Sequence, residues 1–186
     1  SETGEARAHD HCELVYTLCR NPDIKKRHTE SWQKILLESI GATWAGQEYV
    51  LGYKPRSRER FDVGLNHAVG SKWPTKAWPE ASWKELAAML ERQGRTVSWQ
   101  RGFDDIREYM EWLNSCRTLI TGDSLGLHLA LAMKKKVVVL YGPTNSNETD
   151  FYGRGVGIYP KGYDCLPCFS PVCTQKIHCL TTISAR

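Results

Sequence analysis

The stretch from residue 118 to residue 144, TLITGDSLGLHLALAMKKKVVVLYGPT, restricts the fold of this chain more than any other segment. Thr118 to Thr121 is a short apolar run rich in β-branched residues, which is typical of a strand buried on both faces. Leu125 to Met133 is almost entirely apolar, which predicts a buried helix, and Lys134 to Lys136 are expected to end it. Val137 to Tyr141 has the pattern of a second buried strand. The stretch therefore predicts a βαβ unit in a parallel sheet.

The rest of the chain extends this alternation. A turn is expected at residues 21–23 and a helix from about Thr29 to Ile40, which Gly41 ends. Further strands are predicted at Phe61 to Asn66, Thr96 to Gln100 and Gly155 to Tyr159. Helices are predicted from near Pro79 to Gly94, and from Asp104 onward with a buried stripe of Ile106, Tyr109, Met110 and Leu113. The fold class that follows is α/β, a Rossmann-like parallel sheet with helices on both faces.

Length and composition limit the number of domains and the classes of ligand that this chain can have. With 186 residues, 41% of them hydrophobic and 25% charged, the chain has the size of one large domain or of one domain with an extension. A net charge of +4 permits an anionic ligand and does not require nucleic acid. There is no apolar run of about 20 residues and no signal-peptide pattern, and the chain begins with Ser1 rather than Met. We divide it into residues 1–28 (extension or linker), 29–60 (connecting helix and basic loop), 61–163 (Rossmann-like domain) and 164–186 (Cys-rich tail).

Residues 123–128 have the position of a ligand-binding loop. They follow a strand and open a helix, where free backbone N–H groups and the helix dipole favour an anion. Gly126 leaves room for a ligand to approach closely. The alternative is an ordinary helix start that Asp123 and Ser124 only cap, with His128 a buried histidine whose hydrogen bonds are satisfied.

A second loop, Ala68 to Lys76, has similar character, because small residues precede a lysine just before a helix. It matches neither the GxxxxGK[ST] pattern nor the GxGxxG pattern. Its Gly70-Ser71 pair and Lys76 can hold a phosphate through backbone N–H groups and an ammonium group. Both loops are expected at one edge of the sheet, which favours a diphosphate ligand.

The segments WPTKAWP (residues 73–79) and GDSLGLHLALAMKKKVVVLYGPT (residues 122–144) resemble the C-terminal half of glycosyltransferase family 9, the ADP-heptose:lipopolysaccharide heptosyltransferases and their relatives. The resemblance covers roughly residues 60–183, and the helix at 29–40 resembles the segment that joins the two halves. It implies a GT-B fold, in which two Rossmann-like domains face a cleft and the C-terminal one binds the nucleotide sugar.

The resemblance also implies roles for single residues. Lys76 is expected on the donor phosphates, and Asp123, Ser124 and His128 are expected at the donor. The family places Gly directly after the Ser or Thr, whereas this chain has Leu125 there and Gly126 one position later. The predicted donor-binding residues are Val69, Gly70, Ser71, Thr75, Lys76, Asp123, Ser124, Leu125, Gly126 and His128.

The activity implied is transfer of a sugar from an ADP-heptose-like donor to a lipopolysaccharide-type acceptor in bacteria, without a catalytic metal or cofactor. The family's acidic base lies in the N-terminal domain, so we expect no catalytic residue in this chain and no activity from it alone. The implied partners are the nucleotide-diphosphate sugar and, through the N-terminal domain, a glycolipid acceptor; nucleic acid is not among them. The implied location is the cytoplasm, at the inner face of the inner membrane.

Four cysteines crowd the tail in a C-x2-C-x4-C-x5-C pattern, at Cys165, Cys168, Cys173 and Cys179. Four thiols at this spacing can close around Zn²⁺ or an iron–sulfur cluster, with His178 as a substitute ligand. The alternative is a reduced or disulfide-linked tail. Cys12, Cys19 and Cys116 look like ordinary thiols.

Two other functions compete with sugar transfer. The first is a Rossmann-like nucleotide-binding module whose metal-binding tail contacts nucleic acid. It rests on the tail and on a basic cluster that also fits a solvated linker, formed by Lys54, Arg56, Arg58 and Arg60. The second is a nicotinamide-dependent oxidoreductase, which the missing dinucleotide fingerprint disfavours.

Overall fold

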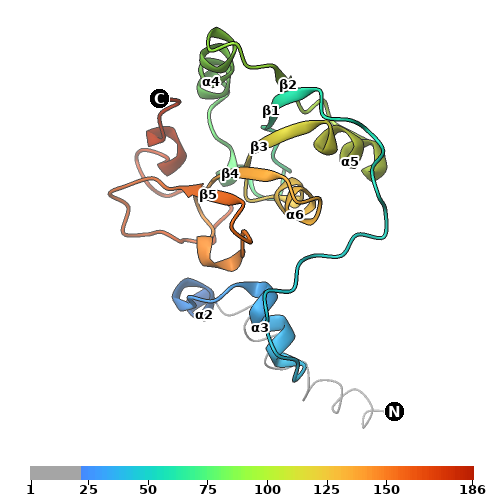
Figure 1. The fold of residues 1–186 in the computed structure, drawn as a ribbon. Coiled ribbons are helices and arrows are strands. Elements are labelled where there is room, and N and C mark those ends of the chain that lie inside the picture. Colours follow the sequence, from blue (N-terminus) through green and yellow to red (C-terminus); the bar gives the residue numbers. More distant parts are fainter. Residues whose placement is uncertain (1–21) are drawn as a thin grey trace.

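The computed structural model describes residues 22–186, which form a five-stranded parallel sheet with helices on both faces (Figure 1). The strands are β1 (Phe61–Asn66), β2 (Val97–Trp99), β3 (Cys116–Gly122), β4 (Lys136–Leu140) and β5 (Gly155–Ile158). They lie in the order β2-β1-β3-β4-β5, and each neighbouring pair is parallel. The predicted parallel α/β sheet is confirmed. Because β1 and β3 are neighbours, the loops that follow them lie side by side at the carboxyl edge.

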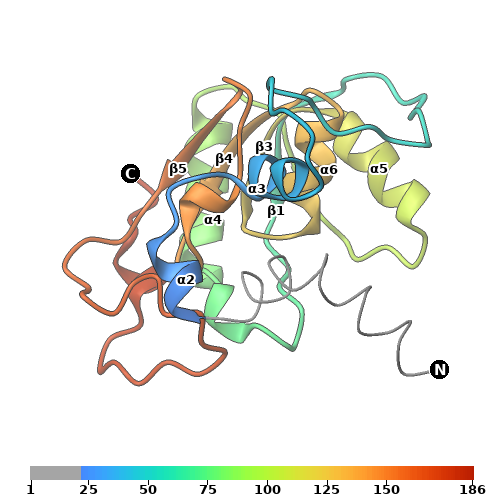
Figure 2. The same ribbon diagram turned by 90° about the horizontal axis from the view of Figure 1, so that it is seen from below.

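Two helices cover one face of the sheet and one helix covers the other, as the view from below in Figure 2 shows. α5 (Ile106–Asn114) and α6 (Leu125–Ala132) share a core with side chains of β3 and β4. α4 (Glu80–Arg92) shares the second core with Leu65 and Leu140, which alternate onto the opposite face. The predicted stripe of α5 is correct at Met110 and Leu113, whereas Ile106 is 52% exposed.

A segment that we call the strap, residues 49–57, crosses α5 and α6. Tyr49, Leu51 and Tyr53 pack against the core of those helices. The Glu111 carboxylate of α5 accepts hydrogen bonds from the Tyr53 hydroxyl and from the backbone N–H of Arg56 and Ser57, at 3.0 Å and 2.7 Å for the two amides. The basic side chains nearby are exposed, as a solvated linker predicts, but the backbone is docked.

The N-terminal part of the described chain holds two short helices, α2 (Pro22–Arg27) and α3 (Trp32–Ser39). The turn predicted at residues 21–23 is wrong in that Pro22 opens α2, and the predicted helix at 29–40 starts only at Trp32. Ser31 sets that start, since its side chain accepts from the backbone N–H of Lys34. The Asn145 side-chain amide donates to two backbone carbonyls of residues 25–28 and so ties this region to the loop after β4. Residues 1–21, with Cys12 and Cys19, lie outside the described part.

The lysine run after α6 does not simply end the helix as predicted. Lys136 is the first residue of β4. Lys135 is only 9% exposed, and its ammonium bonds Glu59 at 2.9 Å and the Asn114 carbonyl at 2.7 Å. The buried ammonium therefore joins the chain before β1 to the end of α5, rather than serving as a solvated cation at the helix dipole.

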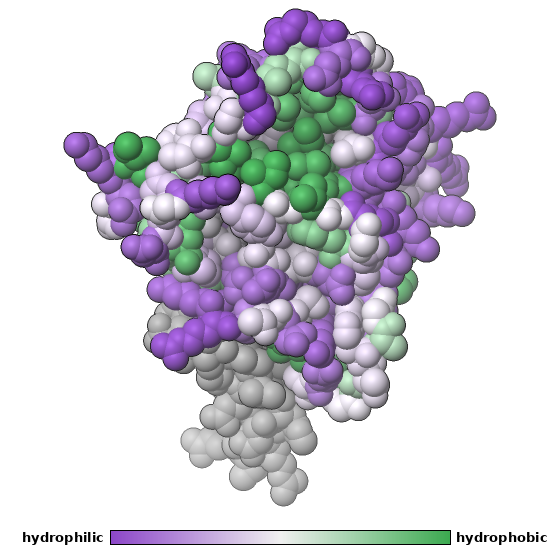
Figure 3. All heavy atoms as spheres, turned by 60° about the vertical axis from the view of Figure 1, so that its left-hand side comes forward, coloured by the Kyte–Doolittle hydropathy of each residue, from purple (hydrophilic) through white to green (hydrophobic). Residues whose placement is uncertain are grey.

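The side of the molecule that carries β5 is partly apolar at its surface. Val156 and Ile158, on one face of β5, are 54% and 39% exposed. Figure 3, turned toward this side, shows hydrophobic side chains gathered in its upper half among hydrophilic ones. Within residues 22–186, none of the helices combines the length and the apolar character needed to cross a bilayer.

Candidate functional site

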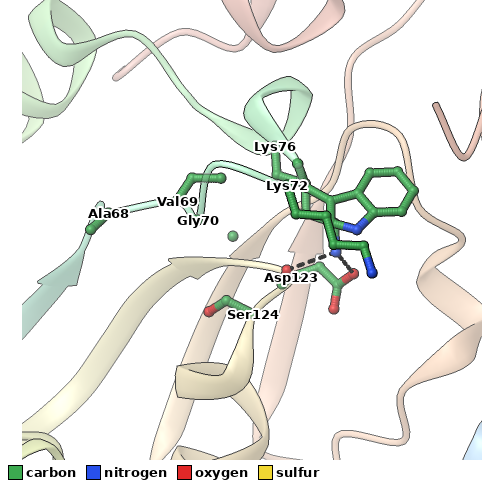
Figure 4. A pocket seen from close by; sticks show the side chains of 9 residues that line it. Ala68, Val69, Gly70, Lys72, Lys76, Asp123 and Ser124 are labelled. Carbon is green, nitrogen blue, oxygen red and sulfur yellow. Dashed lines mark hydrogen bonds and ion pairs between the residues drawn. The ribbon is translucent and has the colours of Figure 1, made fainter. Parts of the chain in front are cut away.

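The loops after β1 and β3 enclose a cavity of about 220 Å³ at the carboxyl edge of the sheet (Figure 4). The first loop reaches its 3-10 turn, η1 (Pro74–Lys76), and the second passes directly into α6. The lining residues are Ala68, Val69, Gly70, Lys72, Trp73, Lys76, Gly122, Asp123 and Ser124. The two loops singled out by the sequence thus form one cavity.

Lys76 and Asp123 connect the two loops directly. The Lys76 ammonium lies 2.7 Å from a carboxylate oxygen of Asp123 and 3.0 Å from its backbone carbonyl (Figure 4). Both side chains are largely shielded, with 18% and 16% of their surface exposed, and the ammonium lies over the ring of Trp73. Lys76 is therefore an ion-paired group rather than a freely solvated one, and its replacement would leave a shielded carboxylate without its partner.

Ser124 holds the N-cap position of α6 without capping it. Its backbone is extended, and its hydroxyl accepts no hydrogen bond from the first turn. The hydroxyl instead lies 3.1 Å from the side-chain amide of Asn66 and 3.2 Å from the Thr121 hydroxyl. The first N–H groups of α6 consequently have no side-chain partner from Ser124, so they remain available to an anion at the helix N-terminus.

Gly126 faces Tyr109 and Asn66 rather than the cavity. The Tyr109 hydroxyl donates to the Asn66 side-chain carbonyl at 2.8 Å, and burial raises the pKa of Tyr109 to about 12. A Cβ atom at position 126 would overlap the Tyr109 hydroxyl and lie 2.6 Å from the Asn66 amide nitrogen. These two side chains explain why residue 126 is a glycine.

His128 lies one turn into α6 and is not among the residues that line the cavity. Its Nδ1 is 3.0 Å from the hydroxyl of Tyr49 in the strap, and the two rings meet edge to face. Burial lowers the pKa of His128, while the nearby Asp123 carboxylate partly opposes this, so burial favours the uncharged ring. The Nδ1 atom of His128 therefore already has a hydrogen-bond partner within the chain, the hydroxyl of Tyr49.

Three other predicted site residues lie apart from the cavity lining. Ser71 is exposed, and Leu125 is 55% exposed. Thr75 is buried, and its hydroxyl donates to the Ser170 carbonyl at 2.7 Å, which attaches the tail to the first loop. Of the ten predicted residues, the cavity thus gathers Val69, Gly70, Lys76, Asp123 and Ser124.

Sequence reasoning missed the polar residues beneath the cavity. Asn66 and Thr121 end β1 and β3, and Tyr109 lies on α5, so their contact depends on the pairing of strands far apart in the sequence. The one local signal was Asn66, a polar residue at the end of a buried strand. Lys72 and Trp73 were inside the predicted loop but were not named as site residues.

The structure gives no support of its own for the predicted metal site at the tail cysteines. Cys165 and Cys168 are half-buried, Cys173 is exposed and Cys179 is buried, and all four are free thiols. Burial raises the pKa of the Cys179 thiol, and the three other cysteines nearby raise it further. Among residues 22–186, no group of three or more His, Cys, Asp or Glu side chains is arranged to hold a metal ion. Cys116 is buried and free, as predicted.

Comparison with known proteins gives a consistent set of matches. Residues 102–178 match the sequence model of glycosyltransferase family 9 (heptosyltransferase). The chain is 30% identical over 140 residues to lipopolysaccharide heptosyltransferase 1 of Pseudomonas aeruginosa, an alignment that covers 62% of this chain and 39% of that protein.

Solved structures share the fold. E. coli heptosyltransferase WaaC with ADP has a TM-score of 0.58 at 16% identity and covers 82% of this chain and 52% of its own. The glycosyl transferase family 9 protein from Veillonella parvula has a TM-score of 0.54 at 20% identity and covers 86% of this chain and 58% of its own. The predicted fold, a Rossmann-like sheet matching one half of GT-B heptosyltransferases, is thus confirmed. The chain spans less than two thirds of each relative.

Proposed function

We propose that this chain, whose residues 102–178 match the sequence model of glycosyltransferase family 9, is the donor-binding half of a heptosyltransferase-like glycosyltransferase. In this proposal residues 61–163 bind a nucleotide-diphosphate sugar, most simply an ADP-heptose. Residues 29–60 connect this half to an N-terminal domain, residues 1–28 precede that connection, and residues 164–186 form the tail. The donor is proposed by analogy with WaaC, a structural relative solved with ADP.

The observation that carries the proposal is the meeting of Lys76 with the N-terminus of α6 across one cavity. An ammonium group and free helix N–H groups stabilise a diphosphate by charge and by hydrogen bonds. Lys72 lines the same cavity and adds a second cation. The cavity is therefore suited to the diphosphate part of a sugar donor.

The chemistry follows from that placement. When the bond between the sugar and the diphosphate breaks, negative charge develops on the leaving phosphate oxygen. Lys76 and the α6 N-terminus lie where they can stabilise that charge, which is the requirement for a diphosphate leaving group. A base must also take the proton of the acceptor hydroxyl, and we assign it to the N-terminal domain together with the lipopolysaccharide-type acceptor. Such an enzyme works in the bacterial cytoplasm, at the inner face of the inner membrane.

Replacing Lys76 by alanine tests the proposal. We expect Lys76→Ala to weaken ADP binding by about 1.5–3 kcal/mol, the range for a hydrogen bond to a charged group. Calorimetric titration of ADP into both proteins measures the change, and a thermal melt records any loss of stability from the unpaired Asp123.

The matched control is Lys136→Ala, which removes one exposed positive charge at the first residue of β4, the opposite edge of the sheet. It should leave ADP affinity unchanged, and a single-stranded oligonucleotide should bind none of the three proteins. Equal ADP affinity in wild type and Lys76→Ala would remove Lys76 from the site and with it the main support for the proposal.

A further inference from the structure

Four polar side chains form a hydrogen-bonded network beneath the cavity between the two loops. Asn66 ends β1, Thr121 lies near the end of β3, Tyr109 belongs to α5, and Ser124 directly precedes α6. Asn66 is 4% exposed and Thr121 is fully buried, whereas Ser124 is part of the cavity wall (Figure 4). The network thus connects the buried ends of two neighbouring strands to the wall of the cavity.

We propose that Asn66 is a positioning residue for diphosphate binding, because it holds the Ser124 hydroxyl away from the first turn of α6. The first N–H groups of that helix are then left to the diphosphate. This inference rests on the proposed function, since it takes the cavity with Lys76 as the diphosphate site. It goes beyond that function by giving a role to a residue that lies outside the cavity lining and acts through Ser124.

The hydrogen bonds of the network fix the direction of each polar group. The Asn66 side-chain carbonyl accepts from the Tyr109 hydroxyl at 2.8 Å, which sets the orientation of the amide. The amide nitrogen then donates to the hydroxyls of Thr121 and Ser124, at 2.8 Å and 3.1 Å. The Thr121 hydroxyl donates to the Gly122 carbonyl at 2.8 Å, so its oxygen is left to accept from the Ser124 hydroxyl at 3.2 Å. The Ser124 hydroxyl is therefore held from two sides.

Without these bonds, Ser124 would be a favourable N-cap residue for α6. Serine is among the preferred residues there, and the backbone of Ser124 already has the extended geometry of that position, with φ −152° and ψ 173°. A capping serine accepts a hydrogen bond from the second or third N–H group of the helix, here that of Gly126 or Leu127. An anion at a helix N-terminus binds the same groups. The serine hydroxyl and the diphosphate therefore compete for one set of donors, and Asn66 removes the serine from that competition.

Two other helices of the chain are capped in the ordinary way. Ser31 at the start of α3 and Asp105 at the start of α5 each accept a hydrogen bond from a backbone N–H group of the first turn. Ser124 has the same side chain as Ser31 and the same position on its helix, but its hydroxyl is bound to Asn66 instead. The difference therefore comes from the network and not from the type of residue.

An asparagine suits this role because its amide is uncharged. An aspartate at position 66 would also bind the Ser124 hydroxyl, but it would place a negative charge beside the diphosphate. Gly126 contributes as well, since a Cβ atom there would overlap the Tyr109 hydroxyl that orients the Asn66 amide. The network thus keeps the serine from capping the helix without adding a charge that opposes the ligand.

A double-mutant cycle measured with inorganic pyrophosphate tests the role of Asn66. Asn66→Ala should weaken pyrophosphate binding about fivefold in calorimetry, the factor that corresponds to a typical N-cap side chain. The same substitution in a Ser124→Ala background should cost no affinity, because the competing hydroxyl is already absent. The control is Asn114→Ala, which removes an amide that bonds Ser57 twice at the far end of α5. It should lower the melting temperature and leave pyrophosphate affinity unchanged.

Amide hydrogen exchange of the ligand-free protein gives a readout that a loss of stability alone would not produce. In Asn66→Ala, the released Ser124 hydroxyl should slow exchange at the Gly126 or Leu127 amide, whereas a merely destabilised helix would exchange faster there. Pyrophosphate should slow exchange at the same end of α6 in the wild type.

The possible outcomes separate this inference from the proposed function. If Asn66→Ala does not fold, Asn66→Thr takes its place in every comparison, since its hydroxyl is one atom shorter than the amide and its β-branched side chain suits a strand. Unchanged pyrophosphate affinity in the Asn66 variant would overturn the positioning role and leave the diphosphate site intact. An equal loss in the Ser124 and Ser124→Ala backgrounds would do the same. Wild-type protein that binds neither pyrophosphate nor ADP would overturn the proposed function and this inference together.

Discussion

At the scale of single residues, the close contact between Gly126, Tyr109 and Asn66 gives a prediction about stability. Gly126→Ala adds a methyl group that overlaps the Tyr109 hydroxyl and approaches the Asn66 amide. We expect it to lower the free energy of unfolding by about 1–3 kcal/mol, the usual cost of overpacking, despite the better helix propensity of alanine. Urea denaturation measures the change.

Two further variants isolate the cause. Gly70→Ala adds the same methyl group where no heavy atom lies within 4 Å, so it should be nearly silent. Tyr109→Phe in the Gly126→Ala background removes the overlapping hydroxyl and should recover part of the loss. If Gly126→Ala is as stable as Gly70→Ala, the overlap is relieved by a small shift of the tyrosine and the explanation for the glycine position is wrong.

His128 supplies a prediction about pH. Burial depresses its pKa below the ordinary value of 6.5, so the unfolded chain takes up a proton at a higher pH than the folded chain does. The free energy that the neutral His128 ring contributes to the folded state is present above pH 6.5 and is lost as the pH falls below that value. We expect wild type to lose more unfolding free energy than His128→Gln between pH 7.5 and pH 5.5, measured by denaturation at both values. Glu148, whose pKa burial raises, works in the opposite direction in both proteins and cancels in the comparison.

At the scale of elements, the strap depends on a single carboxylate. Hydrogen bonds from the Tyr53 hydroxyl and from the backbone N–H of Arg56 and Ser57 lower the pKa of Glu111 to about 2. The unfolded value is near 4.5, so this support is complete above pH 4.5 and is lost as pH falls toward 2.

Hydrogen exchange at the strap tests this clamp. In Glu111→Gln, the protection factors of the Arg56 and Ser57 amides should fall at least tenfold at pH 7, while amides of β3 should keep theirs. Wild type should show a similar selective loss between pH 4.5 and pH 2, whereas Glu111→Gln should not lose further protection there. Protection that persists in the variant would mean that the apolar contacts of Tyr49 and Leu51 hold the strap without Glu111.

The order of elements could be predicted from the sequence because each strand and helix has a local pattern. The β-branched run at residues 118–121 and the apolar helix after it are examples. The predicted ends of both elements differ from the observed ends by no more than two residues. The strap could not be predicted in this way. Its anchor, Glu111, lies 54 and 55 residues from the amides it binds, and alternating exposed basic residues resemble a solvated linker.

The candidate site likewise has one part that the sequence could predict and one part that it could not. Lys76 and Asp123 belong to recognisable loops, so their meeting follows once β1 and β3 are neighbours in a parallel sheet. The roles of Tyr49 and Asn66 depend on side-chain packing between distant segments, for which the local sequence has no signal.

At the scale of the whole molecule, the proposed division of labour predicts binding without transfer. Residues 22–186 contain one parallel sheet, whereas a GT-B enzyme needs two domains to bring donor and acceptor together. The 186-residue chain should therefore bind ADP-heptose, detected by calorimetry, and should release no ADP in the presence of a lipopolysaccharide acceptor. Joining it to a family N-terminal domain should restore transfer. Robust transfer by the chain alone would contradict the assignment of the base to another domain.

The ion pair between Lys76 and Asp123 has a consequence for how a ligand leaves. An incoming diphosphate must take over hydrogen bonds that the ammonium already makes, so binding is an exchange of one anion for another. Because Asp123 offsets the charge of Lys76, the long-range electrostatic attraction of the cavity for a diphosphate comes mainly from Lys72. The rate at which a diphosphate associates should therefore depend only weakly on ionic strength. When the product diphosphate departs, Asp123 is in place to receive the ammonium again. In the proposed reaction cycle the Lys76–Asp123 pair thus becomes neutral again at each turnover, which should ease the release of a strongly charged product.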